Sequence, residues 1–270
     1  MNSDIILVST STFSGRYWSN GSSYRFAEKT LVCPVTHQEL AALANNFALA
    51  VLEDEHHSVV AVLGVRPEQN LFVDPLGKWI GSIVPQALAN GAFKLLRTDD
   101  DQFALGFDMA SGLLAKANEG EPFFDGHGQP TRAIRQILQD LLRVHHGQQV
   151  LARAAALLAE HDLLEPWPIK LQDGAQERSV TGLWRVSEQG LALLDDAAFI
   201  ELRRSGALVL AYAQLLSMPN ISVLGRLAQL HAQHAALASQ REAEVSAMFE
   251  PLTENDGEID WAALLKEDQV

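Results

Sequence analysis

Residues 170–220 read KLQDGAQERSVTGLWRVSEQGLALLDDAAFIELRRSGALVLAYAQLLSMPN, and this stretch decides the fold. Its Asp173-Gly174 pair predicts the turn of a β-hairpin, because Gly accepts the left-handed dihedrals of tight turns. Two helices follow, hinged at Ser205-Gly206, since Gly often ends a helix. The second helix, residues 207–218, is apolar on nearly every face. We therefore expect it to be buried on all sides.

Capping residues mark the helices on either side of this hinge. Asp195 is placed to cap the first helix of the pair, and Asn220 to cap a last long helix over residues 221–249, because Asp and Asn side chains accept helix N-terminal N–H groups. Apolar residues of that last helix, with His234 among them, recur at three- and four-residue spacing: Leu224, Leu227, Leu230 and Leu237. This short coiled-coil-like seam either docks on the protein's own body or mediates self-association.

The residues before this stretch predict strands first and one long helix later. Residues 1–25 are rich in Ser, Thr, Gly and Tyr, and we interpret them as a flexible N-terminal arm. Hairpins are expected over residues 47–65 and 93–107, and a helix over 131–162, which Gly147 kinks or divides. The predicted fold is therefore α+β. An antiparallel β-rich N-terminal half packs on a helical C-terminal half that ends in a long amphipathic helix, all in one domain over residues 26–249.

Two segments share the pattern F-x-D-x-x-G, namely FVDPLGK from Phe72 and FFDGHGQ from Phe123. Asp at the start of a turn bonds the backbone two residues on, and Gly at the fourth position accepts left-handed dihedrals. Both segments therefore predict tight turns that close strands. The alternative is a carboxylate–histidine cluster for acid–base or metal chemistry, made of Glu119, Glu121, Asp125 and His127.

The overall charge argues against several classes of partner. The chain has 270 residues with 20 basic and 34 acidic side chains, a net charge of −14. Nucleic acids and anionic membranes need clustered Lys and Arg, so we expect neither as a partner. No apolar run reaches the roughly 20 residues of a membrane span, and no secretory signal is visible. The prediction is a cytoplasmic protein without membrane insertion, which reaches a cell surface only by signal-independent export.

The single cysteine, the C-terminal tail and the absence of common catalytic motifs give three further predictions. Cys33 lies in an apolar strand, so we expect a buried and inert thiol. Residues 250–270 form a tail with seven acids and one lysine, and within it Trp261, Leu264 and Leu265 share one side of a helical turn. These three residues could bind a groove of this chain or of a partner. The usual nucleotide, phosphate, hydrolase and zinc-protease motifs do not occur, and we expect no metal or cofactor.

Several blocks of sequence, in order within residues 26–230, carry a family resemblance: NLFVD at 70–74 with Gly77 and Trp79, GEPFFD at 120–125 with Gly128, LLEP at 163–166, TGL at 181–183 and ELRRSGA at 201–207. On these blocks the chain resembles the SapC family, named for an S-layer-associated bacterial protein. The resemblance implies Gram-negative bacteria and genes that lie near TonB-dependent receptors and tryptophan halogenase-like proteins. It carries no established catalytic residue. This chain departs from the family at residues 83–92, IVPQALANGA, where members have a basic-tyrosine run.

Three functions follow, of different classes. The first is a non-enzymatic accessory or interaction protein beside an enzyme or a surface system, with a protein partner or self-association through residues 221–249. The second is a small-molecule binder or enzyme, and the third is an S-layer structural protein. For the second, the candidate site is where the two turns, Trp79 and the edges of the 170–220 stretch approach each other. Its candidate residues are Asp74, Trp79, Glu121, Asp125, His127, Trp184 and Arg203.

Overall fold

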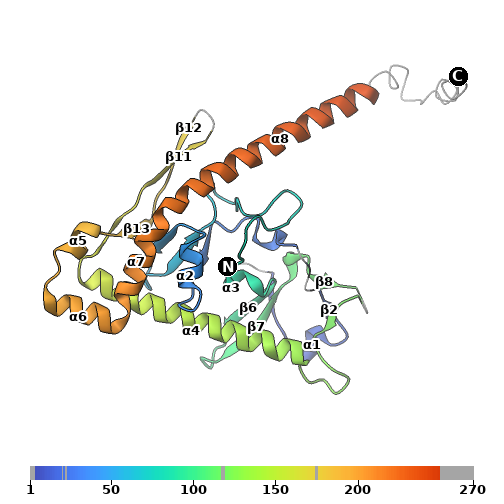
Figure 1. Ribbon diagram of the computed structural model, residues 1–270. Helices are drawn as coiled ribbons and strands as arrows, with labels where there is room; N and C mark the ends of the chain where they lie inside the picture. The colour runs from blue at the N-terminus through green and yellow to red at the C-terminus, as the bar shows by residue number, and fades with distance from the viewer. Residues whose placement is uncertain (1–3, 20, 22, 117–118, 174–175, 250–270) are drawn as a thin grey trace, which may run out of the picture. The chain divides into compact units, whose positions relative to one another are not determined.

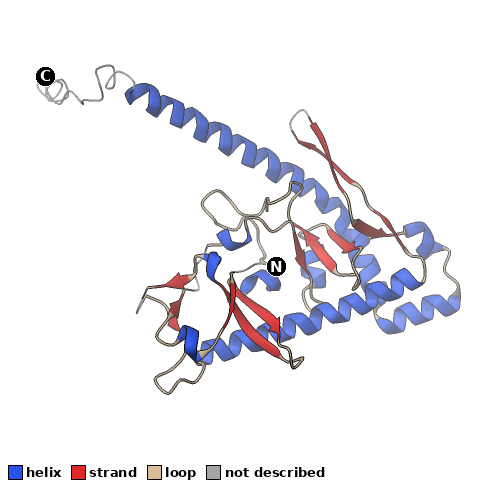
Figure 2. Cartoon of the chain, turned by 180° about the vertical axis from the view of Figure 1, so that it is seen from behind, coloured by secondary structure: helices blue, strands red, loops and turns tan. Residues whose placement is uncertain are grey.

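The computed structural model describes residues 4–19, 21, 23–116, 119–173 and 176–249. It confirms the predicted α+β class, with antiparallel sheets in the N-terminal half and helices dominating the C-terminal half (Figures 1 and 2). The chain divides into two compact units, residues 1–225 and 226–270. This division falls inside the last helix, earlier than the boundary at residue 249 that we expected.

The central sheet of the first unit has five antiparallel strands in the order β10-β13-β4-β5-β3. In that order they are β10 (Leu164–Pro166), β13 (Leu183–Val186), β4 (Leu49–Leu52), β5 (Val59–Val62) and β3 (Val32–Pro34). β4 and β5 form one of the predicted hairpins, and nearly all of their side chains are buried. β13 pairs with β4. A strand from the C-terminal half therefore completes a sheet begun in the N-terminal half.

Two three-stranded sheets are formed by strands of the N-terminal half of the chain. One has the order β1 (Ile5–Leu7), β7 (Phe103–Asp108), β6 (Phe93–Arg97), and the other the order β8 (Leu114–Ala115), β2 (Tyr17–Trp18), β9 (Glu121–Pro122). β6 and β7 are the second predicted hairpin. A separate ribbon joins β11 (Ile169–Asp173) to β12 (Gln176–Val180). It is the hairpin predicted at Asp173-Gly174, although Gly174 lies outside the described residues.

The N-terminal segment is part of the fold and differs from the flexible arm that we expected. β1 pairs along β7, and α1 (Thr10–Phe13) places Phe13 in an aromatic core with no exposed surface. The ring of Phe13 lies 4.6 Å from that of Phe123 and 5.8 Å from that of Phe107, between centroids. Burying a phenylalanine stabilises a fold by about 1.5–3 kcal/mol, which explains why this polar-rich segment is held in place.

Short helices connect these strands: η1 (Arg25–Ala27), α2 (Leu40–Ala44), α3 (Gln86–Ala89) and η2 (Met109–Ser111). Glu39, just before α2, is buried, and its Oε1 accepts from the amide of Thr36 at 3.1 Å. Its Oε2 also accepts from the amide of Gln86 at 2.8 Å, which ties α3 to α2. In β3, burial raises the pKa of the Cys33 thiol to about 12, so the thiol stays protonated at neutral pH.

Helix α4 (Arg132–Glu160) is one continuous helix that contacts both β5 and β6 (Figures 1 and 2). Thr131 caps it, accepting from the amide of Ile134. Gly147 neither kinks nor divides this helix, contrary to expectation. A Cβ there would lie 2.8 Å from that of Thr36, and the Gly147 carbonyl accepts from the amide of His37 at 3.3 Å. The glycine therefore lets the loop before α2 pack directly on α4.

The helical pair of the opening stretch is α6 (Asp196–Ser205) and α7 (Ala207–Ser217), preceded by α5 (Glu188–Ala192). Asp195 caps α6 as expected, and Gly206 has a φ of 82° at the predicted hinge. The prediction that α7 is buried on all sides is wrong. Its Val209, Tyr212 and Leu216 side chains are 66%, 51% and 78% exposed. These three residues, which we name the α7 stripe, lie on one face of the helix.

The opposite face of α7 packs on the central sheet through two fully buried polar residues. Gln214 Nε2 donates to the carbonyl of Leu49 at 3.0 Å, and its Oε1 accepts from the amide of Val186 at 3.0 Å. Ser217 Oγ accepts from the amide of Leu49 at 2.9 Å. These side chains satisfy backbone groups of β4 and β13 that have no strand partner there.

After α7 come η3 (Met218–Asn220) and α8 (Ile221–Phe249), which runs into the second unit. We expected Asn220 to cap α8, but its side chain has a different role. Its Nδ2 donates to the carbonyls of Ala44 at 2.8 Å and Phe47 at 3.3 Å, so it satisfies the end of α2 instead. By length and composition the helical stretch Ala207–Ser246 could cross a membrane, although its α7 part packs on the sheet. The expectation of no membrane insertion therefore stays a prediction.

Candidate functional site

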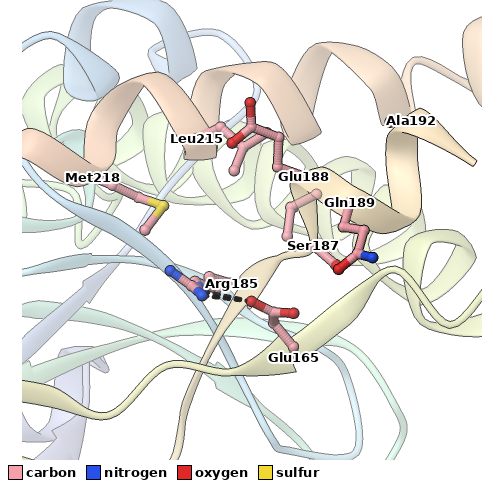
Figure 3. Close-up of a pocket in the computed structure, with 9 residues that line it drawn as sticks. Glu165, Arg185, Ser187, Glu188, Gln189, Ala192, Leu215 and Met218 are labelled. Atoms are coloured by element: carbon pink, nitrogen blue, oxygen red, sulfur yellow. Dashed lines mark hydrogen bonds and ion pairs between the residues drawn. The ribbon is translucent and has the colours of Figure 1, made fainter.

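A cavity of about 510 Å³ opens where the last strands of the central sheet meet α5 and α7 (Figure 3). Its lining residues come from β10, β13, α5, α7 and η3, all in the first unit: Glu165, Arg185, Val186, Ser187, Glu188, Gln189, Ala192, Leu215 and Met218. In Figure 3 Glu165 and Arg185 lie on one side, with Leu215 and Met218 on the other. The cavity therefore has one charged wall, and on the other side apolar side chains lie beside the carboxylate of Glu188.

An ion pair between neighbouring strands forms the charged wall. The antiparallel register of β10 and β13 places Glu165 directly opposite Arg185. Glu165 Oε1 accepts from Arg185 Nε at 2.8 Å and from Nη2 at 2.6 Å, with both side chains about 40% exposed. The pair neutralises its own charges. Its unused carboxylate oxygen and guanidinium N–H groups remain available to a polar ligand.

Local backbone chemistry fixes the rest of the lining. Ser187 ends the strand and caps α5, its hydroxyl accepting from the amide of Gly190 at 3.2 Å. The bond from the Val186 amide to Gln214 holds the neighbouring backbone against α7. Glu188 and Gln189, in the first turn of α5, add polar side chains to the cavity rim. We call this arrangement the Glu165–Arg185 cavity.

The polar groups of this lining are two carboxylates, one guanidinium, one amide and one hydroxyl. None of the nine residues that the structure describes around the cavity is His, Cys, Lys or Tyr, and the one hydroxyl nucleophile, Ser187, already accepts a backbone bond. Covalent catalysis by serine needs a neighbouring base. Throughout the described ranges, no group of three or more His, Cys, Asp and Glu side chains is arranged to hold a metal ion.

The two F-x-D-x-x-G segments are tight turns of the same design, as the sequence predicts. Asp74 Oδ1 accepts from the amides of Leu76 at 2.9 Å and Lys78 at 2.7 Å, and Gly77 has a φ of 82°. A single bridge between Val73 and Trp79 closes this turn in place of the two strands expected there.

The second turn repeats each of these contacts. Asp125 Oδ1 accepts from the amides of His127 and Gln129, both at 2.9 Å, and Gly128 has a φ of 73°. The backbone N–H of Gln129, followed by that of His127, lowers the pKa of the Asp125 carboxyl. The Asp125 carboxylate therefore stabilises the backbone of its own turn. Glu121 lies on the exposed side of β9, and the His127 side chain is exposed.

The remaining candidates are scattered over the first unit. Trp79 is buried against Phe72, with ring centroids 5.5 Å apart, and its Nε1 donates to the carbonyl of Ile83 at 2.8 Å. Trp184 lines a separate cavity of about 230 Å³ with His57 and Asp54. Arg203 is exposed in the last turn of α6.

The structure therefore brings together Asp74 with Trp79, and Asp125 with His127, but only as neighbours within each turn. Of the seven candidates, Trp184 lines the cavity of about 230 Å³, and none lines the Glu165–Arg185 cavity. The predicted tail contacts Trp261, Leu264 and Leu265 lie outside the described residues.

Sequence reasoning missed all nine residues that line the Glu165–Arg185 cavity. Opposite charges at Glu165 and Arg185 were a usable signal, since opposite-charge pairs stabilise neighbouring strands. The pairing register of β10 and β13 was needed to recognise it. That register depends on the chain between the two strands, where the β11–β12 ribbon intervenes.

Comparison with known proteins gives one result. No curated protein and no solved structure matches the chain. The model of the SapC family matches residues 8–224, which includes every strand from β2 onward, the Glu165–Arg185 cavity and the α7 stripe. Because this match covers most of the chain, the protein belongs to the SapC family.

Proposed function

We propose that this protein is a non-enzymatic accessory protein that binds a partner protein through the α7 stripe. The observation that supports the proposal most is the exposure of Val209, Tyr212 and Leu216 on a helix whose other face is fully packed. Exposed apolar patches on folded proteins mark interaction surfaces more often than isolated apolar residues do.

The spacing of the stripe suits a helix-mediated contact. Its residues are three and four positions apart, so they project from consecutive turns of one face. Helical recognition elements present anchors at such positions to an apolar groove. Covering one large apolar side chain contributes about 1.5–3 kcal/mol, so three anchors supply a useful part of a binding free energy. An aromatic anchor such as Tyr212 is also typical of interface hot spots.

The partner of this proposal is a protein encoded beside this one. Family resemblance suggests such neighbours among TonB-dependent receptor and halogenase-like genes of Gram-negative bacteria. A cytoplasmic location remains part of the proposal. An S-layer structural role is the third hypothesis, and no feature of the fold favours it over the first.

A small-molecule binder is the second candidate, and the Glu165–Arg185 cavity favours it. The volume of about 510 Å³ falls in the range of about 300–1,000 Å³ that is typical of ligand sites. The lining offers both charged groups and apolar side chains, which together orient a ligand. A ligand that remains bound through purification would support this alternative.

Self-association through the helix of residues 221–249 is a further route to a protein contact. Leu230, Leu237 and Val245 of α8 are about half exposed, at 46%, 54% and 53%. Light scattering of the purified protein across a concentration series measures this association directly. A mass that stays at one chain would remove it from the proposal.

Native mass spectrometry of the purified chain, alone and with each neighbouring gene product, tests the proposed function. The double variant Val209→Ser, Leu216→Ser removes two anchors of the α7 stripe. Leu76→Ser is the matched control, because Leu76 is equally exposed at 81% but lies on the Asp74 turn.

We expect a complex with one neighbour for the wild type and the control, and a loss of that complex for the double variant. Failure to bind any neighbour, together with a retained small ligand, would replace the accessory role by the binder. Equal binding by the double variant would remove the α7 stripe from the proposal.

A further inference from the structure

A second, larger groove lies beside the end of β3 and the β4–β5 turn, away from the edge strand β10. Its volume is about 850 Å³, and its walls come from the β4–β5 turn, the β6–β7 hairpin, the end of β3 and α4, all within the first unit. We call it the α4 groove. It shares no lining residue with the Glu165–Arg185 cavity.

The α4 groove is elongated along its helix. Residues of α4 that line it recur from His145 through Gln149 and Ala152 to Ala156, at spacings of four, three and four. They therefore share one face of three helical turns, about 16 Å long at 1.5 Å per residue. An extended peptide of about five residues has this length.

The floor of the groove is apolar. Val35 and Val59 are buried beneath it, and Ala152 and Ala156 add methyl groups from α4. Phe103 remains 39% exposed, with its ring packed edge-on against His145 at 4.8 Å between centroids. This floor offers contact area to apolar side chains of a ligand.

The rim is basic, in contrast to the acidic chain that surrounds it. Two arginines and three histidines line the groove against one glutamate: Arg97, Arg153, His56, His57, His145 and Glu55. The whole chain carries a net charge of −14, with 20 basic and 34 acidic side chains, so an excess of basic groups sets this lining apart from the chain as a whole. The lining carries a charge of +1 with neutral histidines and +4 when all three are protonated.

The two arginines differ in whether a carboxylate of the described residues pairs with them. Arg97 pairs with Asp101 at the tip of the hairpin. Arg153 donates its Nε to the carbonyl of Gln149 at 3.3 Å, and the described residues offer it no ion pair. A carbonyl accepts one N–H of a guanidinium and leaves the others for an anion.

We infer that the α4 groove binds an acidic, partly apolar peptide segment of a partner protein. The basic rim selects carboxylates, the apolar floor takes the intervening side chains, and the length along α4 exceeds what a single small anion fills. This inference does not depend on the α7 stripe and stands even if the proposed function fails. It identifies the chemistry of a partner that the α7 stripe leaves open.

His145 makes this binding sensitive to pH. Burial first, then the neighbouring charges of Arg97 and His146, lower the pKa of His145 below its ordinary value. The other charged or titratable groups of the groove are Glu55, His56, His57 and Arg153, with Asp101 held by Arg97. In the free protein His145 is therefore neutral at pH 7.

A bound carboxylate reverses this balance, because an opposite charge stabilises the protonated imidazole. The pKa of His145 in the complex then lies above that of the free protein. Proton uptake strengthens binding as pH falls through the bound-state pKa, and the gain is complete below the free-state pKa. Peptide carboxylates stay ionised down to about pH 5, so the effect falls between about pH 5 and 7.

Fluorescence anisotropy with the full-length protein tests this inference. The probe is a labelled 12-residue peptide of alternating glutamate and leucine, and its control replaces every glutamate by lysine. Arg153→Gln removes the rim arginine that has no ion pair among the described residues, and His145→Gln removes one of the three histidines of the groove. Arg143→Gln is the matched control, because Arg143 is also an exposed arginine of α4 but lies outside the groove.

We expect the acidic peptide to bind, the lysine peptide not to bind, and Arg153→Gln to weaken binding by about tenfold, the loss of one charge-assisted contact. Arg143→Gln should bind like the wild type. Lowering the pH from 8 to 5.5 should strengthen wild-type binding by at least about threefold, and this gain should be smaller in His145→Gln, which keeps His56 and His57. Circular dichroism confirms that each variant is folded.

Three results would overturn the inference. One is no binding of the acidic peptide at any pH in this range. Another is equal binding by Arg153→Gln and the wild type. The third is complete displacement of the peptide by millimolar inorganic phosphate, which would show a site for small anions.

Discussion

The two faces of α7 differ in a way that its apolar sequence does not predict: the buried face includes two polar residues, and the exposed face is apolar. The face toward the central sheet buries Gln214 and Ser217 completely, whereas the opposite face exposes Val209, Tyr212 and Leu216. Each buried polar group has a backbone partner in β4 or β13. Folding thus explains the buried face. It does not explain the exposed one, which is why we assign that face to a partner.

Substitution of Gln214 should have the largest effect on stability. Gln214→Leu keeps the size of the side chain but leaves the Leu49 carbonyl and the Val186 amide unsatisfied in the core. We expect the free energy of unfolding to fall by about 2–4 kcal/mol, since each buried unsatisfied group costs about 1–3 kcal/mol. Urea denaturation measures this loss. The exposed Gln139→Leu on α4 is the control, and an equal effect of both would refute the bonding role of Gln214.

Ser217 should matter less, because it satisfies one backbone group of the sheet where Gln214 satisfies two. Ser217→Ala removes the acceptor of the buried Leu49 amide, and we expect a loss of about 1–2 kcal/mol in the same denaturation experiment. The exposed Ser222→Ala on α8 should change stability by less than about 0.5 kcal/mol. A loss for Ser217→Ala as small as that of this control would show that water replaces the hydroxyl.

Changes to the α7 stripe should affect stability least of all. The double variant Val209→Ser, Leu216→Ser removes apolar side chains that are already exposed, so its free energy of unfolding should fall by less than about 1 kcal/mol. A loss as large as that of Gln214→Leu would mean that the stripe stabilises the fold. The contrast between the two faces would then disappear.

Local chemistry made much of the fold predictable. The two hairpins, the cap at Asp195, the hinge at Gly206 and the paired Asp turns depend on residues close together in sequence. The repeated turn was recognisable because Asp and Gly each have one preferred place in it. Because the Asp74 and Asp125 carboxylates bond the backbone of their own turns, we no longer regard them as candidate ligand-binding residues.

Predictions failed where long-range packing decides. The N-terminal segment looks polar, but Phe13 anchors it in an aromatic core. α7 is apolar all round, but its packing against the central sheet, α2, α4 and α6 leaves one of its faces exposed. Asn220 has the chemistry of a helix cap and instead bonds the end of α2, far away in sequence. The Glu165–Arg185 cavity required the register of strands that are separated by a ribbon.

Hydroxyl-radical footprinting of Tyr212 and Leu216 tests the assignment of the α7 stripe most directly. It compares the isolated protein with its complex with the neighbouring gene product. We predict rapid oxidation of both residues in the isolated chain and strong protection in the complex, with Leu76 equally oxidised in both. Protection already in the isolated chain, or unchanged oxidation in the complex, would contradict the assignment of the α7 stripe to a partner.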